Sequence, residues 1–125
     1  MENIVCLGTV GCKIGKELEK YKKYKMFYID DSGKKRKRFL KLKKHADPEK
    51  YEEEYDTECD RFLKSIQGNV TMVLCGASLV SSASLRILEP LKHRCEKINI
   101  LYIKPETSLL SETKKLQERV VRNVL

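Results

Sequence analysis

Two loops of this chain have the residue types that bind phosphate. The first contains Gly8, Thr9, Val10 and Gly11, and the second covers residues 76–82. Main-chain N–H groups at the start of a helix donate to a phosphate, and hydroxyl side chains add further donors. We therefore expect an anion site where each loop opens a helix. The candidate donors of the second loop are Gly76, Ala77, Ser78, Ser81 and Ser82.

Neither loop has a standard nucleotide-binding motif. The glycines at positions 8, 11 and 15 do not follow the spacing G-x-G-x-x-G, and the sequence has no G-x-x-x-x-G-K-[ST]. Glycine after a strand is also common as simple turn geometry. Since both loops are expected at the same edge of a sheet, a ligand site and plain turns stay open as alternatives.

Other catalytic chemistries find little support in the sequence. His45 and His93 are expected on different elements, and the Cys and His residues lack the spacing of a zinc site. The serines near residues 78–84 have no G-x-S-x-G pattern and no evident general base. The sequence therefore does not predict a hydrolase triad.

Basic residues are concentrated in one segment. The net charge is +8, and residues 34–44 hold eight Lys or Arg in eleven positions, with Lys43 and Lys44 at the end. Phe39, Leu40 and Leu42 alternate with these cations, which is typical of a charged edge strand. Contact with phosphate is the alternative. Nucleic-acid binding is not expected, although the basic run leaves it open.

Length and cysteine usage indicate the class of protein. A chain of 125 residues with 41% hydrophobic and 35% charged residues predicts one domain with a dense ionic surface. Five cysteines without C-x-x-C spacing predict reduced thiols and a cytoplasmic protein. No apolar run reaches the roughly 18 residues of a membrane span.

Apolar runs of strand length alternate with helical periodicity along the chain. This order predicts an α/β, Rossmann-like three-layer sandwich with a mostly parallel sheet. The expected strands are residues 3–7, 25–29, 38–42, 70–75 and 98–103.

Four helices are expected between and after these strands. The first follows Gly8 with Ile14, Leu18 and Tyr21 on one face. The others are residues 48–66, ended by Gly68; residues 82–95, with Leu85, Leu88, Leu91 and Cys95 facing inward; and a last helix from Ser108 or Ser111 to Leu125. Because that last helix has no C-cap signal, we expect the chain to be the first part of a longer protein.

In this order the motifs resemble the N-terminal, nucleotide-binding half of the tubulin/FtsZ superfamily. Gly8-Thr-Val-Gly-Cys-Lys-Ile-Gly15 is similar to the tubulin loop G-Q-C-G-N-Q-I-G. His45-Ala-Asp-Pro-Glu49 resembles the G-A-N-P-E that follows the third phosphate loop of FtsZ. Residues 70–82 occupy the place of strand four and the loop G-G-G-T-G-[ST]-G, and residues 98–105 resemble the strand that ends in Lys-Pro.

The resemblance implies GTP or GDP as the ligand, with Mg²⁺ possible. It also implies self-association or a full-length tubulin-like partner, and hydrolysis completed by an acidic loop of the next subunit, so that this chain alone is not expected to act as a GTPase. In addition to the two loops, it suggests that Lys43 and Lys44 meet the terminal phosphate and that Glu106 or Glu112 meets the ribose. The second loop departs from the family by carrying Leu79 and Val80.

Two other functions stay open. A degenerate relative could keep the fold and bind a partner without nucleotide, which the departures at Leu79 and Val80 favour. A small Rossmann-type dinucleotide binder would use Asp30 or Asp31, after the second strand, to reach the ribose.

Overall fold

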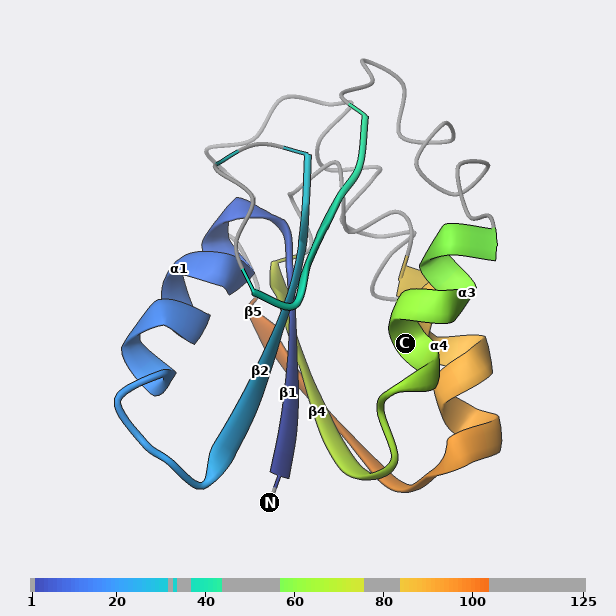
Figure 1. Cartoon of the computed structure of the whole chain (residues 1–125). Coiled ribbons are helices and arrows are strands. Elements are labelled where there is room, and N and C mark those ends of the chain that lie inside the picture. Colours follow the sequence, from blue (N-terminus) through green and yellow to red (C-terminus); the bar gives the residue numbers. More distant parts are fainter. Residues whose placement is uncertain (1, 32, 34–36, 44–56, 76–83, 104–125) are drawn as a thin grey trace.

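The computed structural model describes residues 2–31, 33, 37–43, 57–75 and 84–103, and these residues form one parallel sheet between two layers of helix (Figure 1). All four strand pairings are parallel, and the strand order is β3-β2-β1-β4-β5. The predicted α/β, Rossmann-like fold with a parallel sheet is therefore confirmed. The strands are β1 (Glu2–Leu7), β2 (Tyr24–Asp30), β3 (Phe39–Lys41), β4 (Gly68–Cys75) and β5 (Cys95–Ile103).

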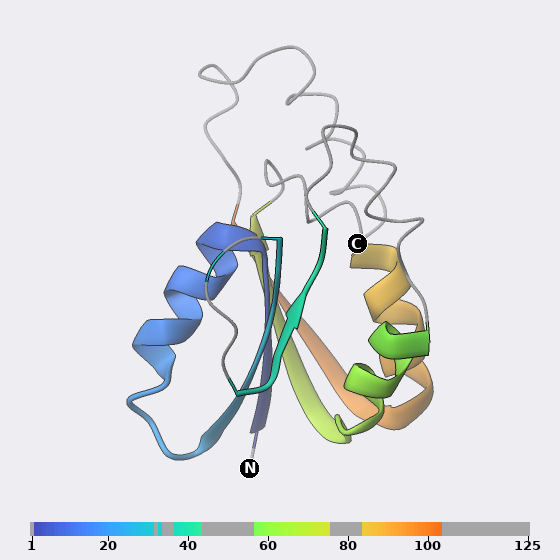
Figure 2. The same cartoon turned by 45° about the horizontal axis from the view of Figure 1, so that its top comes forward.

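The described helices cover both faces of the sheet. α1 (Gly8–Leu18) lies on one face, and α3 (Thr57–Lys64) and α4 (Ser84–Arg94) lie together on the other (Figure 2). Helices on both faces are the usual consequence of parallel strands, because each crossover returns the chain over the sheet.

The strands divide their apolar side chains between the two helical layers. On β1, Val5 and Leu7 face α3 and α4, whereas Ile4 and Cys6 face α1. The larger cluster, next to α3 and α4, adds buried residues of β2, of β4, of the two helices and of the segment after α3: Phe27, Ile29, Val70, Met72, Leu74, Leu63, Ile87, Leu88, Leu91 and Ile66. Burial on both faces explains why the central strands are nearly uncharged in sequence.

β3 is an edge strand, as its basic sequence predicts. Among the described strands it is last in the order and pairs with β2 alone, with Tyr28 opposite Phe39. The connection, residues 31–38, is shorter than the dozen or so residues of an ordinary parallel crossover. It ends at Arg38, a non-glycine residue with φ 53°. The Arg38 carbonyl accepts from the Tyr28 N–H at 2.9 Å, and its Nε donates to the Met26 carbonyl at 2.8 Å.

The first helix is shorter than predicted. It ends at Leu18, and Tyr21 lies beyond it with 54% of its surface exposed, so the placement of Tyr21 on the buried face was wrong. Ile14 and Leu18 do pack against the α1-facing cluster, the buried residues on the α1 side of the sheet: Ile4, Cys6, Cys12, Met26, Tyr28, Phe39 and Val73. Tyr21 is flanked by Lys20 and Lys22, which cannot be buried cheaply, and the chain turns there to enter β2.

The predicted end of the second helix was also wrong. α3 ends at Lys64, and Gly68, expected to end it, begins β4 with φ +85°. Ile66 is fully buried after the helix rather than within it. Residues 48–56 of that prediction lie outside the described residues.

The boundary between α4 and β5 differs from the prediction as well. Cys95 begins β5 instead of ending the helix, while Leu88 and Leu91 face the core as expected. Leu101 of β5 is 49% exposed, because β5 ends the order of described strands. The side chain of Leu85 and the last helix, residues 108–125, lie outside the described residues.

Candidate nucleotide-binding site

The strand order reverses between β1 and β4. From β1 the sheet continues to β2 and β3 on one side and to β4 and β5 on the other. β1 and β4 are neighbours, with Leu7 opposite Leu74, so their carboxyl ends lie side by side. In open parallel sheets, ligands bind outside the carboxyl ends of the strands at such a switch point.

Gly8 turns the chain directly from β1 into α1 at this point. Leu7 is extended, with φ −116° and ψ 123°, and Gly8 follows with φ +79° as the first helical residue. A side chain at that φ would be strained, so glycine is required by the geometry of the turn. The position of this predicted loop at the switch point follows from the strand order.

The first turn of α1 has donors without a side-chain cap. Leu7, at the N-cap, is fully buried and gives no capping hydrogen bond, and the first turn has no acidic residue. The first four N–H groups of a helix have no partner within the helix, and the helix dipole adds positive potential there. Thr9 and Val10 are exposed, Val10 by 40%. The turn can therefore present backbone donors to an anion.

Thr9 is joined to the end of β2. Its Oγ1 donates to Oδ2 of Asp30 at 3.4 Å, and the N–H of Asp31 donates to Oδ1 of Asp30 at 2.8 Å. Asp30 is only 4% exposed, and this burial raises the pKa of its carboxyl, while the Asp31 N–H opposes the shift. The sequence suggested a role for Asp30 only as a ribose ligand of a dinucleotide. Its contact with Thr9 was not predictable, because it depends on how β1 is aligned with β2.

Gly11 has a packing role that its predicted phosphate role did not include. A Cβ at Gly11 would lie 2.5 Å from the Val73 carbonyl oxygen in β4. One turn later, a Cβ at Gly15 would lie 2.5 Å from Cys6 Sγ. Both glycines let α1 lie close to the sheet, which is the role of the third glycine in dinucleotide-binding loops.

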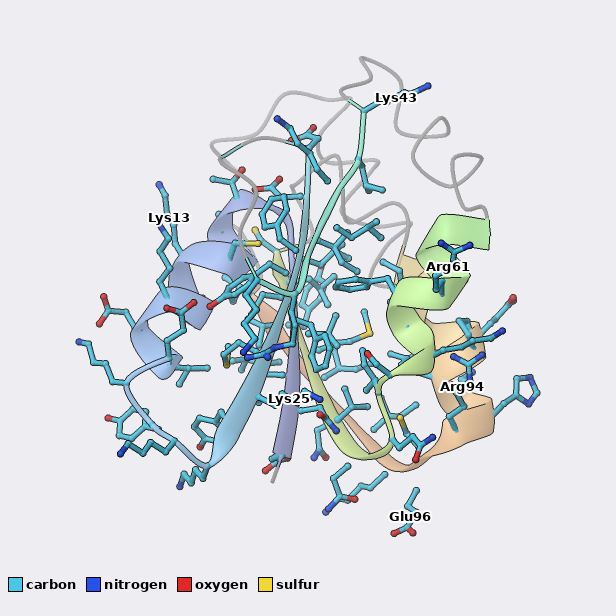
Figure 3. The ribbon with its side chains drawn as sticks, in the orientation of Figure 1. Lys13, Lys25, Lys43, Arg61, Arg94 and Glu96 are labelled. Atoms are coloured by element: carbon cyan, nitrogen blue, oxygen red, sulfur yellow. The ribbon has the colours of Figure 1, made fainter. Side chains whose placement is uncertain are left out.

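Lys43 lies at the same edge of the sheet. It is exposed, two residues beyond β3, and the Leu42 N–H donates to the Asp30 carbonyl at 2.8 Å, which keeps this segment beside β2 (Figure 3). The structure thus places Gly8, Thr9, Val10 and Gly11 in one helical turn, with Lys43 at the same edge, two strands from β1. The remaining candidates lie outside the described residues: Lys44, Gly76, Ala77, Ser78, Ser81, Ser82 and Glu106.

The described residues contain neither a metal-binding cluster nor a membrane-spanning helix. No group of three or more His, Cys, Asp or Glu side chains within them is arranged to hold a metal ion. Among the same residues, no helix has the length and apolar character needed to cross a membrane.

Comparison of the chain with protein-family models found no matching family, and comparison with curated proteins found no matching relative. The resemblance to the tubulin/FtsZ superfamily therefore depends on the motifs and their order in the sequence.

Proposed function

We propose that the chain binds a nucleotide, GTP or GDP, at the carboxyl edge of its sheet, as a divergent member of the tubulin/FtsZ superfamily. The observation that carries the proposal is Gly8, which begins α1 directly at the switch point with φ +79°. This turn aims uncapped backbone donors at the place where open parallel sheets bind ligands. The choice of guanine comes from the sequence resemblance.

The local charges also favour a phosphate. The first turn of α1 lacks acidic residues, Thr9 adds a hydroxyl, and Lys43 adds a cation at the same edge. The carboxylate that contacts this turn, Asp30, is buried, and it accepts hydrogen bonds from the Thr9 hydroxyl and the Asp31 N–H. In this proposal the main-chain N–H groups of the first turn of α1 bind the phosphate, and Lys43 adds electrostatic attraction for a terminal phosphate.

The filament role is part of the same proposal. In the tubulin/FtsZ family an acidic loop of the next subunit completes hydrolysis, so we expect a single copy of the chain to bind GTP without releasing phosphate. Self-association or a longer tubulin-like partner would then supply the opposing surface.

The proposal is tested by thermal unfolding with nucleotides. GTP or GDP with Mg²⁺ should raise the melting temperature, because a ligand that binds only the folded state stabilises it. Val10→Glu should abolish the shift: it places a carboxylate in the first turn of α1, where the helix tolerates it but a phosphate is repelled. Val10→Gln, similar in size and uncharged, should retain the shift. A melting temperature unchanged by both nucleotides at millimolar concentration would favour the interaction module without nucleotide.

A second candidate is favoured by Asp30. It ends β2 and follows Gly8 by 22 residues, close to the spacing of about 20 at which dinucleotide-binding folds place their ribose carboxylate. The same thermal assay with NADH or NADPH distinguishes this function. A shift with a dinucleotide and none with GTP or GDP would replace the first proposal by the second.

A further inference from the structure

The excess of positive charge lies in one segment of the chain. Between Lys13 and Lys44, fourteen Lys and Arg residues face only four Asp and Glu, whereas the rest of the chain has more acidic than basic residues. This segment comprises most of α1, all of β2 and β3, and the turn between α1 and β2. Such a charge asymmetry is the electrostatic footprint of a surface that attracts a polyanion.

The α1–β2 turn, residues 19–23, combines these charges with an exposed aromatic ring. Its sequence places Tyr21 beside Lys20, Lys22 and Lys23. Tyr21 is 54% exposed, and its ring contacts Tyr24 edge to face at 6.1 Å between centroids. Tyr24 in turn packs against the α1-facing core cluster. The exposed Tyr21 ring therefore packs against Tyr24, which is itself held by the core.

Backbone hydrogen bonds hold the turn in one conformation. The Tyr21 N–H donates to the Leu18 carbonyl at 3.0 Å, and the Tyr24 N–H donates to the Tyr21 carbonyl at 3.2 Å. The Glu2 N–H donates to the Lys23 carbonyl at 3.0 Å, which ties the turn to the start of β1. Little conformational entropy is then lost when the turn binds a partner.

Exposed cations extend from this turn along α1. Lys16 is exposed near the end of α1, and Lys22 and Lys23 are exposed in the turn. Two carboxylates lie among them. Glu17 accepts from Lys20 at 2.7 Å, and Glu19 accepts from the Tyr28 hydroxyl. The surface made of Lys16, Tyr21, Lys22 and Lys23 therefore keeps a net positive charge.

We propose that this surface binds single-stranded nucleic acid, with Tyr21 stacking on a base and the lysines contacting phosphates. Proteins that bind single strands without sequence preference combine these two features, a basic track and aromatic side chains on which bases stack. A base-paired duplex would offer the lysines its phosphates but would leave Tyr21 without an open base. The exposed ring therefore favours the single strand.

This surface is separate from the candidate nucleotide site. In a parallel sheet, the turn from a helix into the next strand lies at the amino ends of the strands, opposite the edge from which α1 starts. Figure 3 shows Lys25, at the start of β2, at the opposite end of the sheet from Lys43. The inference therefore does not depend on the proposed nucleotide function.

Fluorescence anisotropy with a labelled oligothymidine of about 20 nucleotides tests the proposal, at several salt concentrations. Tyr21→Ala should weaken binding by about tenfold, the effect of losing one stacked base. Tyr21→Phe, which keeps the ring, should bind as the parent does. Lys22→Gln with Lys23→Gln should weaken binding and reduce its salt dependence. The charge-matched control is Lys92→Gln with Lys97→Gln, on α4 and β5, which should change neither quantity.

Four results would overturn the proposal. The first is the absence of oligothymidine binding at low salt. The second is equal binding of oligothymidine by Tyr21→Ala and the parent, and the third is equal binding of polyglutamate and oligothymidine by the parent, since either would leave only a non-specific attraction between charges. The fourth is tighter binding to anionic lipid vesicles than to oligothymidine, with the same dependence on Tyr21, which would assign the surface to a membrane. Circular dichroism of Tyr21→Ala confirms that the variant is folded.

Discussion

The backbone of Gly11 lies directly against the carbonyl oxygen of Val73, so closely that a Cβ there would be 2.5 Å from that oxygen. The contact joins the first turn of α1, which follows β1, to β4, the strand on the other side of the switch point. It fixes where the donors of the first turn point, because α1 cannot move along or away from β4 without losing its packing. A substitution at Gly11 would therefore disturb folding and could not report on binding alone.

Gly11→Ala should destabilise the protein by about 1–3 kcal/mol, the usual cost of inserting a group into a packed core. Helix propensity alone predicts the opposite, a gain of about 1 kcal/mol for alanine over glycine inside a helix. Urea denaturation separates the two effects by sign. Lys16→Ala, at an exposed position of the same helix, is the control and should change stability little. A stabilised Gly11→Ala would show that α1 does not approach β4 this closely.

Gly15 and Cys6 should be energetically coupled. A Cβ at Gly15 would lie 2.5 Å from Cys6 Sγ and 2.9 Å from Tyr28 Cε1, so Gly15→Ala should be destabilising. Cys6→Ala removes the sulfur and should rescue part of that loss in the double variant, because the clash with Tyr28 persists. A double-mutant cycle measured in urea should give a favourable coupling of about 1 kcal/mol. Strict additivity would contradict the contact.

Asp30 should make the stability of the protein fall as pH rises. Burial raises the pKa of its carboxyl in the folded state, so the folded protein binds the proton more tightly than the unfolded chain does. The resulting stability is fully present below the unfolded pKa of about 3.9 and is lost as pH rises through the raised folded pKa. Asp30→Asn should lack this fall. The free energy of unfolding of Asp30→Asn, relative to that of the parent, should increase as pH rises from the unfolded pKa through the folded pKa of Asp30, and should then stay constant. Urea titrations at each pH measure this difference.

Thr9→Val gives a second test of the same carboxyl. The Thr9 hydroxyl stabilises the ionised form of Asp30, so its removal should raise the pKa of Asp30 further. The fall in stability should then extend to higher pH than in the parent protein. Two-dimensional NMR of the Asp30 carboxyl carbon measures this pKa directly. An unchanged pKa in Thr9→Val would mean that the hydroxyl does not bond to Asp30 in solution.

The strands were predictable from the sequence because parallel strands buried on both faces read as continuous apolar runs, as in β1 and β4. The helix ends were less predictable. Tyr21 fits the apolar periodicity of α1 but follows its end, and Cys95 fits that of α4 but begins β5. In both cases strand pairing sets where the helix ends and the next strand begins. Tyr24 must pair with Glu2 at the start of β2, and Cys95 must pair with Gly68 at the start of β5.

The candidate site was predictable only where it depends on local sequence. Gly8 after an apolar run indicates a strand-to-helix turn, and the structure places it at the switch point. The packing of Gly11 on Val73 and the bond from Thr9 to Asp30 join residues far apart in the chain. Such contacts depend on strand order and register, which periodicity does not determine.

Lys43 should discriminate between triphosphate and diphosphate. If it faces the terminal phosphate of a nucleotide at the carboxyl edge, Lys43→Ala should weaken GTP binding by about fivefold and GDP binding less, as for an exposed charge pair of about 1 kcal/mol. The difference should shrink as salt is added, because an exposed cation is screened within about 10 Å at 0.1 M salt. Lys41→Ala, at an exposed position of β3 itself, is the control and should affect both nucleotides little. Equal losses for GTP and GDP in Lys43→Ala would instead assign Lys43 to the solvated basic edge of the sheet. Isothermal titration at two salt concentrations measures both affinities.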